Sequence, residues 1–138
     1  MTPFKLQIIT PDGVFFDGMA ENVIVRTTVG DKGILAHHEP SVAALTISRF
    51  KVKIDGEFRY GAISSGVIKV SRDKTVILAQ SCEWADEIDV DRAVKAKELA
   101  EKRISEYTSQ PDTDDKQMAI AEYKLKRALN RIETSKFR

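Results

Sequence analysis

Hydrophobic and polar residues follow one pattern up to about Trp84 and a different one from Glu87 onward. In the first part, short runs alternate apolar and polar positions, as in residues 50–54, and turn residues separate the runs. Alternation with a period of two is typical of a strand with one buried face. From Glu87 to the C-terminus there is no glycine, Pro111 is the single proline, and Ala, Lys, Glu and Arg predominate. The pattern predicts an N-terminal antiparallel β-sandwich of about eight to ten strands, followed by a C-terminal antiparallel hairpin of two helices.

Turn residues divide the first part into its expected strands. Pro11-Asp12-Gly13 ends the first run, and Asp55-Gly56 is a two-residue hairpin turn in which glycine supplies a positive φ. Lys51 and Lys53 alternate with apolar residues and are expected on a wet face. The expected strands cover residues 5–10, 14–17, 22–28, 34–35, 50–54, 58–60, 67–71 and 75–80.

Apolar residues in the second part recur at helical spacing. Asp89 is expected to cap the first helix, and Asp112 or Thr113 the second, after a break at residues 109–113. The repeating positions are Ala93, Ala96, Ala100, Ile104 and Tyr107, and then Met118, Ala121, Leu125, Ala128 and Ile132. The alanines allow the helices to approach closely, and the narrow seam leaves most of the hairpin facing water or a charged partner.

Length and composition suit one sandwich domain, residues 1–86, with an appended hairpin domain, residues 87–138. A hairpin of about 50 residues is marginal alone and is expected to rest on the sandwich or on a partner. The net charge is only +1, no apolar run is long enough to span a membrane, and no signal-peptide pattern is present. Cys82 is the only cysteine, which excludes an internal disulfide and indicates a reducing compartment. The chain is expected to be intracellular, and a partner would have to bring it to a membrane.

No motif for chemistry occurs in the sequence. P-loop, dinucleotide-binding, HExxH and CxxC patterns are absent. His37 and His38 share one loop, and Cys82 ends a strand, so both are better explained as structural or solvated residues than as a metal or catalytic site. We therefore expect no catalytic residue and no metal.

The end of the second helix is strongly basic. Only Glu133 offsets six cations after Tyr123, namely Lys124, Lys126, Arg127, Arg131, Lys136 and Arg138. Cations are favoured near a helix C-terminus by about 0.3–1 kcal/mol each, which is one explanation. Docking against an acidic surface is the other.

Several segments together resemble the epsilon subunit of bacterial F-type ATP synthases. Residues 33–45, beginning Gly-Ile-Leu-Ala-His-His-Glu-Pro, resemble that family's GILPGHxPLxxxL segment. The further matching segments are Thr10-Pro11-Asp12-Gly13, residues 64–70 (SSGVIKV), residues 76–79 (VILA), residues 88–93 (IDVDRA) and residues 125–131 (LKRALNR). They cover essentially the whole chain in the same order, and their agreement in register is specific.

The resemblance implies a non-catalytic subunit of the central stalk of the rotor, peripheral to the cytoplasmic face of the bacterial cell membrane. Its sandwich would bind the gamma subunit and the c-ring, with His38 and Pro40 in the rotor contact. Its hairpin would permit turnover when folded on the sandwich. Extended along gamma, it would inhibit ATP hydrolysis at the alpha and beta subunits, with Lys124, Arg127 and Arg131 docked on beta.

Some members of the family bind ATP as a regulatory ligand, although no cofactor is required. The matching positions here are Glu83, Ile88, Asp89, Arg92, Ala93, Arg127 and Arg131. Arg127 and Arg131 are four residues apart and share a helix face, where both could reach phosphates. Leu99 stands where nucleotide-binding relatives carry an arginine, which predicts weaker binding.

The alternative function is a free-standing adaptor whose basic helix binds an acidic protein partner. Nucleic acid is not expected as a partner, because the sequence shows neither an excess of positive charge nor aromatic residues interleaved with Lys and Arg on a sheet face. No sequence motif supports an enzyme with its own active site.

Overall fold

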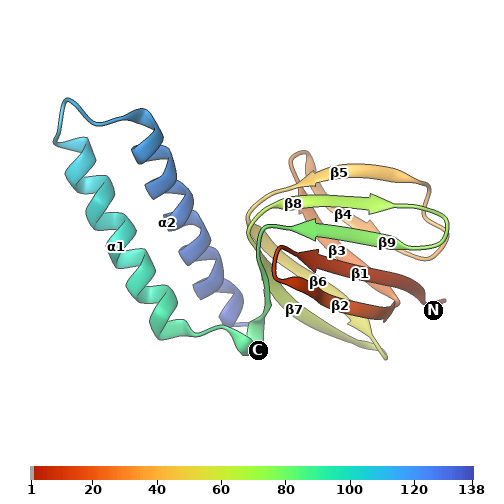
Figure 1. The fold of residues 1–138 in the computed structure, drawn as a ribbon. Coiled ribbons are helices and arrows are strands. Elements are labelled where there is room, and N and C mark those ends of the chain that lie inside the picture. The colour runs from red at the N-terminus through yellow and green to blue at the C-terminus, as the bar shows by residue number, and fades with distance from the viewer. Residues whose placement is uncertain (1) are drawn as a thin grey trace.

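The computed structural model describes residues 2–138 and contains a β-sandwich followed by a helical hairpin, as the sequence predicts (Figure 1). The strands are β1 (Phe4–Thr10), β2 (Gly13–Ala20), β3 (Asn22–Thr27), β4 (Gly30–Ile34), β5 (Ser41–Leu45), β6 (Ser48–Ile54), β7 (Glu57–Ile63), β8 (Gly66–Val70), β9 (Thr75–Ala79) and β10 (Cys82–Trp84). A 3₁₀ turn (Ala85–Glu87) leads into α1 (Val90–Thr108), and α2 (Asp115–Ser135) follows. The predicted fold class is confirmed.

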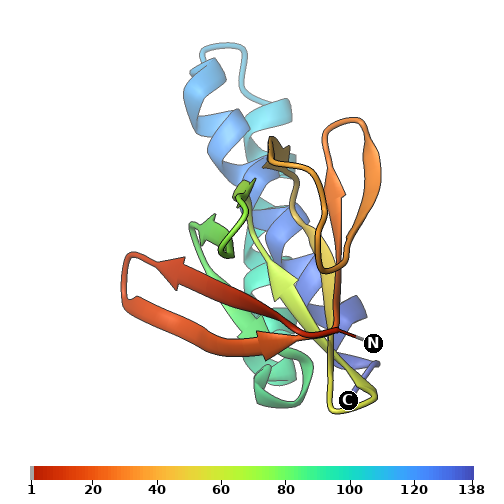
Figure 2. The ribbon, with the colours of Figure 1, turned by 90° about the vertical axis from the view of Figure 1, so that its right-hand side faces the viewer.

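The strands form one sheet that folds over on itself. Its order is β10-β7-β6-β3-β5-β8-β9-β1-β2, with β4 paired to β3. All pairs are antiparallel except β1 with β9. Strands β2 and β6, far apart in this order, contact each other across the core. Figure 2 shows the two layers, with red β1 and β2 on one side and the orange and yellow strands β3 to β7 on the other.

Apolar side chains fill the space between the layers. Trp84 stacks within 5.0 Å of the Phe15 ring centroid and 5.7 Å of the Phe50 centroid. The fully buried aliphatic residues around them come from seven strands: Leu6, Ile8, Val23, Val25, Ile34, Val52, Ile63, Ile68 and Ile77. The sandwich therefore has a continuous core of its own.

The strand predictions hold for most of the sandwich and fail at four elements. Strands β5 and β10 were not predicted, β4 covers Gly30–Ile34 rather than residues 34–35, and β2 extends to Ala20 rather than ending at Asp17. Strand β10 has only three residues and includes Glu83, which leaves too short an alternation to recognise. The β6–β7 turn is confirmed, because Asp55 and Gly56 have φ of 51° and 82°.

The two helices begin at aspartate caps. The Asp89 carboxylate accepts a hydrogen bond from the Arg92 amide at 3.1 Å, which confirms the predicted first cap. The second prediction was wrong, because Asp114 caps α2 rather than Asp112 or Thr113. The Thr113 hydroxyl instead donates to the Tyr107 carbonyl at 2.9 Å and satisfies the end of α1.

Small residues form the seam between the helices. Ala93, Ala100, Ala121 and Ala128 are all at most 3% exposed, as expected for helices in close contact. Ala96 was predicted to belong to this seam, but it is exposed and lines a cavity described below.

The hairpin docks on the sandwich mainly through the C-terminal part of α2, which contacts β6 and β7. The Asn130 side-chain amide donates to the Ser48 carbonyl at 2.9 Å and to the Ile63 carbonyl at 3.4 Å. Beyond α2, the Phe137 ring lies 5.0 Å from the Tyr60 ring, centroid to centroid. Figure 1 shows the opposite end of the hairpin projecting away from the sandwich. Polar contacts rather than an apolar core hold much of this interface.

One expectation about the sandwich surface was wrong. Cations and aromatic rings do interleave on a sheet face, because the β6–β7 register places Lys51 opposite Tyr60 and Lys53 opposite Phe58. The Lys51 ammonium lies 4.6 Å from the Phe58 ring centroid. Period-two alternation identified the lysine face, but only the pairing of the strands brings the rings onto it.

Candidate functional site

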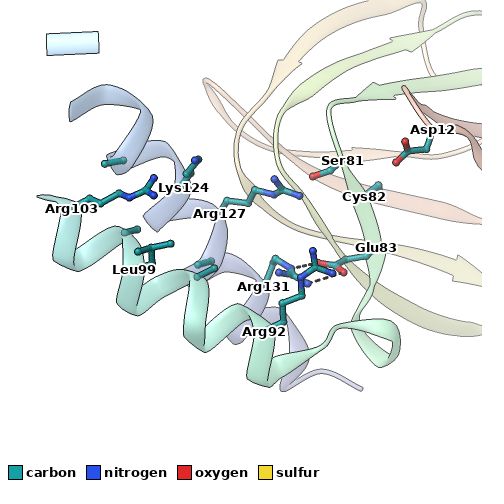
Figure 3. A pocket seen from close by; sticks show the side chains of 14 residues that line it. Asp12, Ser81, Cys82, Glu83, Arg92, Leu99, Arg103, Lys124, Arg127 and Arg131 are labelled. Atoms are coloured by element: carbon teal, nitrogen blue, oxygen red, sulfur yellow. Dashed lines mark hydrogen bonds and ion pairs between the residues drawn. The ribbon is translucent and has the colours of Figure 1, made fainter. Parts of the chain in front are cut away.

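A cavity of about 530 Å³ lies between the hairpin and the sandwich (Figure 3). Helices α1 and α2 form one wall, and β10 with the β1–β2 turn forms the other. Its floor is apolar where alanines of the helix seam and Leu99 reach it. The hairpin thus encloses the cavity only while it is docked on the sandwich.

Cations line most of the cavity. Arg92 and Arg103 come from α1, while Lys124, Arg127 and Arg131 come from α2. The α2 residues follow one another at steps of three and four, which places them on one face of the helix. Two carboxylates, those of Asp12 and Glu83, stand against these five cations. The excess of positive charge makes the cavity suited to an anion.

Only one of the five cations is paired with a carboxylate within residues 2–138. Arg131 makes a two-fold contact with Glu83, through Nε to Oε1 and through Nη2 to Oε2 at 3.4 Å. The two side chains are 18% and 29% exposed, so the pair is partly shielded from water. Arg92, Arg103, Lys124 and Arg127 make no ion pair within that range, and Figure 3 shows Arg127 reaching across toward β10.

The predicted nucleotide residues fall into two groups. Glu83, Arg92, Arg127 and Arg131 meet around the cavity. Ile88, Asp89 and Ala93 are not among its lining residues. These three residues have structural surroundings instead: Ile88 and Ala93 are buried, at 3% and 0% exposed, and Asp89 caps α1. In addition, the Ile88 carbonyl accepts a hydrogen bond from Arg138 Nη2 at 2.7 Å.

Sequence reasoning did not select three polar residues of the cavity: Asp12, Ser81 and Arg103. Arg103 could have been found, because it follows Leu99 by four residues and Arg92 by eleven, which puts all three on one helix face. Leu99 is 50% exposed and does line the cavity. Asp12 comes from the β1–β2 turn, and nothing local indicates that this turn meets the helices.

The basic residues that were predicted to dock on another subunit point into this cavity. Lys124, Arg127 and Arg131 face the sandwich while the hairpin is folded back. Lys124 and Arg127 are exposed in this state, and only Arg131 is partly buried. The docked hairpin thus sequesters Arg131, while Lys124 and Arg127 remain in contact with solvent.

Cys82 lies beside the cavity as a free thiol. Burial raises the pKa of the Cys82 thiol well above its usual range, and the negative charge of Glu83 raises it further. The thiol is therefore neutral at physiological pH. No group of three or more His, Cys, Asp or Glu residues with metal-binding geometry occurs among residues 2–138.

The loop of His38 and Pro40 lies at the end of the sandwich away from the helices (Figure 1). It joins β4 to β5 and lines a second hollow of about 400 Å³ with the β8–β9 turn. His38 Nδ1 is 2.8 Å from the Glu39 carbonyl, and His37 adopts a φ of 64°. Two separate ends of the molecule thus carry the two predicted sets of site residues.

Within residues 2–138, neither helix is long and apolar enough to cross a membrane.

Comparison with known proteins assigns both parts of the chain. Residues 3–85 match the family model "ATP synthase, Delta/Epsilon chain, beta-sandwich domain", and residues 86–136 match "ATP synthase, Delta/Epsilon chain, long alpha-helix domain". The ATP synthase epsilon chain of Ruminococcus albus is 46% identical over 136 residues, covering 98% of each chain. That of Bacillus licheniformis is 41% identical over 136 residues, covering 99% of this chain and 100% of the relative.

Solved structures show the same fold. A chain of the Euglena gracilis mitochondrial ATP synthase superposes with a TM-score of 0.76 at 22% identity, covering 94% of this chain and 79% of that one. A chain of the Tetrahymena thermophila mitochondrial ATP synthase central stalk and c-ring gives 0.64 at 12% identity, covering 97% of each. These matches confirm the predicted resemblance and the prediction of a non-catalytic subunit. The chain belongs to the delta/epsilon chain family of ATP synthases, and its relatives there are bacterial epsilon chains.

Proposed function

We propose that this chain is a coupling and regulatory subunit of the central stalk of a bacterial ATP synthase. Its sandwich binds the gamma subunit and the c-ring, and its hairpin acts on the alpha and beta subunits. The subunit reaches the cytoplasmic face of the cell membrane only through the complex. The observation that carries the regulatory part is the cationic cavity between hairpin and sandwich, which exists in one hairpin position only.

An apolar row on the sandwich supports the contact with gamma. Strand pairing aligns Ile9 with Leu78 and Val14, and Leu78 with Val67, so that the row crosses four neighbouring strands. Val14 and Leu78, on either side of Ile9, are 63% and 53% exposed, which is a high exposure for large apolar side chains in one row. Residues 1–86, with their own core, should fold alone and still assemble with gamma. An unfolded fragment, or one that stays out of the complex, would contradict this part of the proposal.

At the other functional surface, the loop of His38 and Pro40 provides the c-ring contact. This loop projects at the end of the sandwich remote from the hairpin, so a rotor contact there leaves the helices free to move (Figure 1). His38→Ala together with Pro40→Ala should weaken coupling between ion flow and ATP synthesis without changing the fold. Proton pumping by reconstituted complexes measures this, and unchanged pumping would remove the loop from the contact.

The hairpin inhibits ATP hydrolysis when it leaves the sandwich and presents its basic strip to the beta subunit. The strip consists of Lys124, Arg127 and Arg131, which face the cavity in the docked state. Replacing all three by glutamine should raise hydrolysis by the assembled enzyme and flatten its salt dependence. Lys126→Gln is the matched control, since Lys126 lies on α2 outside the cavity. Equal hydrolysis by the triple variant and the control across a salt series would exclude the strip from inhibition.

ATP is the regulatory ligand of the cavity in this proposal. Its volume of about 530 Å³ lies within the range of roughly 300–1,000 Å³ usual for small-molecule sites, and its unpaired cations suit a triphosphate. Bound ATP would hold hairpin and sandwich together and so oppose inhibition. Because Arg131 is already paired with Glu83 and Leu99 offers no charge, we expect weak binding, with a Kd in the millimolar range, about −4 kcal/mol.

Calorimetry on the full chain tests this assignment. Arg127→Ala should abolish binding, because Arg127 is free to bind phosphate and reaches across the cavity. Leu99→Arg should strengthen binding by roughly tenfold or more, since a hydrogen bond to a charged group contributes about 1.5–3 kcal/mol. Lys126→Ala serves as the control and should bind like the unmodified chain. Absence of binding in both the unmodified chain and Leu99→Arg would leave Arg92 and Arg127 without a role in sensing ATP.

A further inference from the structure

The outer face of β6 and β7 carries a ladder of cations and rings that the functions above do not use. Arg49, Lys51 and Lys53 are the successive outward residues of β6, and Phe58 and Tyr60 are their neighbours on β7. The Lys51 ammonium lies 4.6 Å from the Phe58 ring centroid and 5.9 Å from that of Tyr60. The Lys53 ammonium lies 5.9 Å from the Phe58 centroid. Both lysines are thus partly buried, with their ammonium groups beside the rings.

These three cations have no carboxylate partner within residues 2–138. Two other cations of the sandwich are paired: Arg26 with Asp31 at 3.0 Å, and Arg59 with Asp86 and Glu87 at 3.4 Å each. The ladder differs from the remaining unpaired cations in placing three of them at successive outward positions of one strand. The ladder is thus an uncompensated positive strip on a chain whose net charge is only +1. Such a strip is complementary to an anionic partner.

The spacing of the strip favours an extended acidic polypeptide. Alternate residues of a strand are about 6.5–7 Å apart, which is also the spacing of alternate side chains in an extended segment. Carboxylates at every second position could thus meet Lys51 and Lys53 in succession. At Lys51 and Lys53, β6 is paired on both sides, so the segment would lie over the face, along β6, and bind through side chains.

The rings themselves disfavour a nucleic acid in this position. Stacking of bases needs free ring faces, whereas Lys51 and Lys53 lie over Phe58, and Phe137 lies against Tyr60 at 5.0 Å. Each ring thus already has a neighbouring side chain against it.

We propose that the outer face of β6 and β7 docks an extended acidic segment of a partner protein, with carboxylates at alternate positions against Lys51 and Lys53. The C-terminal tail of this chain borders the same surface, because the Arg49 guanidinium carbon lies 3.8 Å from the Phe137 ring centroid. The acidic segment and the docked hairpin therefore share Arg49 as a neighbour. This inference goes beyond the nucleotide and inhibition proposals and does not depend on either.

A synthetic peptide of alternating Glu and Val residues, titrated into the full chain at low salt, is the test. Lys51→Gln with Lys53→Gln should weaken peptide binding by about tenfold, which is the combined effect of two exposed ion pairs near the upper end of their range. The matched control is Lys95→Gln with Lys102→Gln, which removes two exposed charges from α1. The control should change affinity less than twofold, and Lys51→Arg with Lys53→Arg should retain binding.

Three results would overturn the proposal. The first is an equal loss in the two glutamine variants, which would indicate general charge attraction. The second is equal binding of a peptide of alternating Lys and Val by the unmodified chain, a comparison that needs no variant to fold. The third is binding of a poly-dT oligonucleotide or of vesicles with anionic lipid in preference to the acidic peptide. Thermal unfolding of each variant, followed by circular dichroism, verifies that the sandwich is intact.

Discussion

Asn130 offers the most direct control over the position of the hairpin. Its amide donates to two sandwich carbonyls, Ser48 O at 2.9 Å and Ile63 O at 3.4 Å, across 82 and 67 residues of sequence. Asn130→Ala removes both bonds and fills the space with a methyl group that cannot replace them. One good and one long hydrogen bond at a partly buried site are together worth about 1–2 kcal/mol. The undocked population should therefore increase roughly 5–30-fold.

Hydrogen exchange of the full chain measures this change. Amides in the last turns of α2, around the buried Thr134, should exchange faster by that factor, because they are protected only while the helix is docked. Amides of β8 and β9 should keep their rates, since the sandwich core is untouched. Glu133→Ala is the control on the same helix: its contact with Lys136 is 64% exposed at each side chain and contributes little. Unchanged exchange in α2, or equally faster exchange in α2 and β8, would refute the conclusion that the Asn130 hydrogen bonds hold α2 on the sandwich.

Four further outcomes follow from three positions. Gly66→Ala should destabilise the sandwich by at least about 3 kcal/mol, because an added Cβ would lie 2.0 Å from the Leu78 carbonyl oxygen, whereas Gly33→Ala, with no neighbour closer than 3.9 Å, should unfold at nearly the same temperature as the unmodified chain. Cys82 should react with iodoacetamide far more slowly in the native chain than in guanidinium, because burial raises its thiol pKa and little thiolate forms. The same raised pKa means that the folded state holds the Cys82 thiol proton more tightly than the unfolded state does. The contribution of Cys82 to the free energy of unfolding is therefore complete below the ordinary pKa of 9.0 and declines as the pH rises above it. Denaturant titrations at pH 8 and 10 can detect this decline. Leu99→Arg should leave the melting temperature of the chain almost unchanged without ligand, since Leu99 is half exposed, and raise it more than in the unmodified chain when millimolar ATP is added.

Local signals in the sequence were sufficient for most elements. The Asp89 cap and the Asp55-Gly56 turn depend only on residues next to them, and both are observed as predicted. The second cap failed because Thr113 has a competing partner, the Tyr107 carbonyl, six residues back. Where two local explanations compete, the sequence does not say which hydrogen bond forms.

Long-range features could not be predicted in the same way. The contact of Asn130 with Ser48, and the approach of Asp12 to the cavity, depend on how the hairpin settles on the sandwich. The ladder on β6 and β7 was overlooked for a related reason, since Lys51 and Tyr60 become neighbours only through strand register. Helix-face spacing alone nevertheless predicts one cavity residue, because Arg103 follows Leu99 by four residues and so lies beside it on α1.

The difference between the core of the sandwich and the interface of the hairpin explains why one can move while the other does not. The sandwich buries Phe50 and Ile77 almost completely, among many other large apolar side chains. The fully buried apolar residues of the two helices are alanines, which contribute little burial each. The contacts with the sandwich include the Asn130 hydrogen bonds and the ion pair between Arg131 and Glu83. Such contacts exchange readily for equivalent contacts with water or another polypeptide, whereas burial of Ile77 has no substitute outside the core. A ligand that adds even a few kcal/mol of polar contacts in the cavity would therefore shift the hairpin without altering the sandwich.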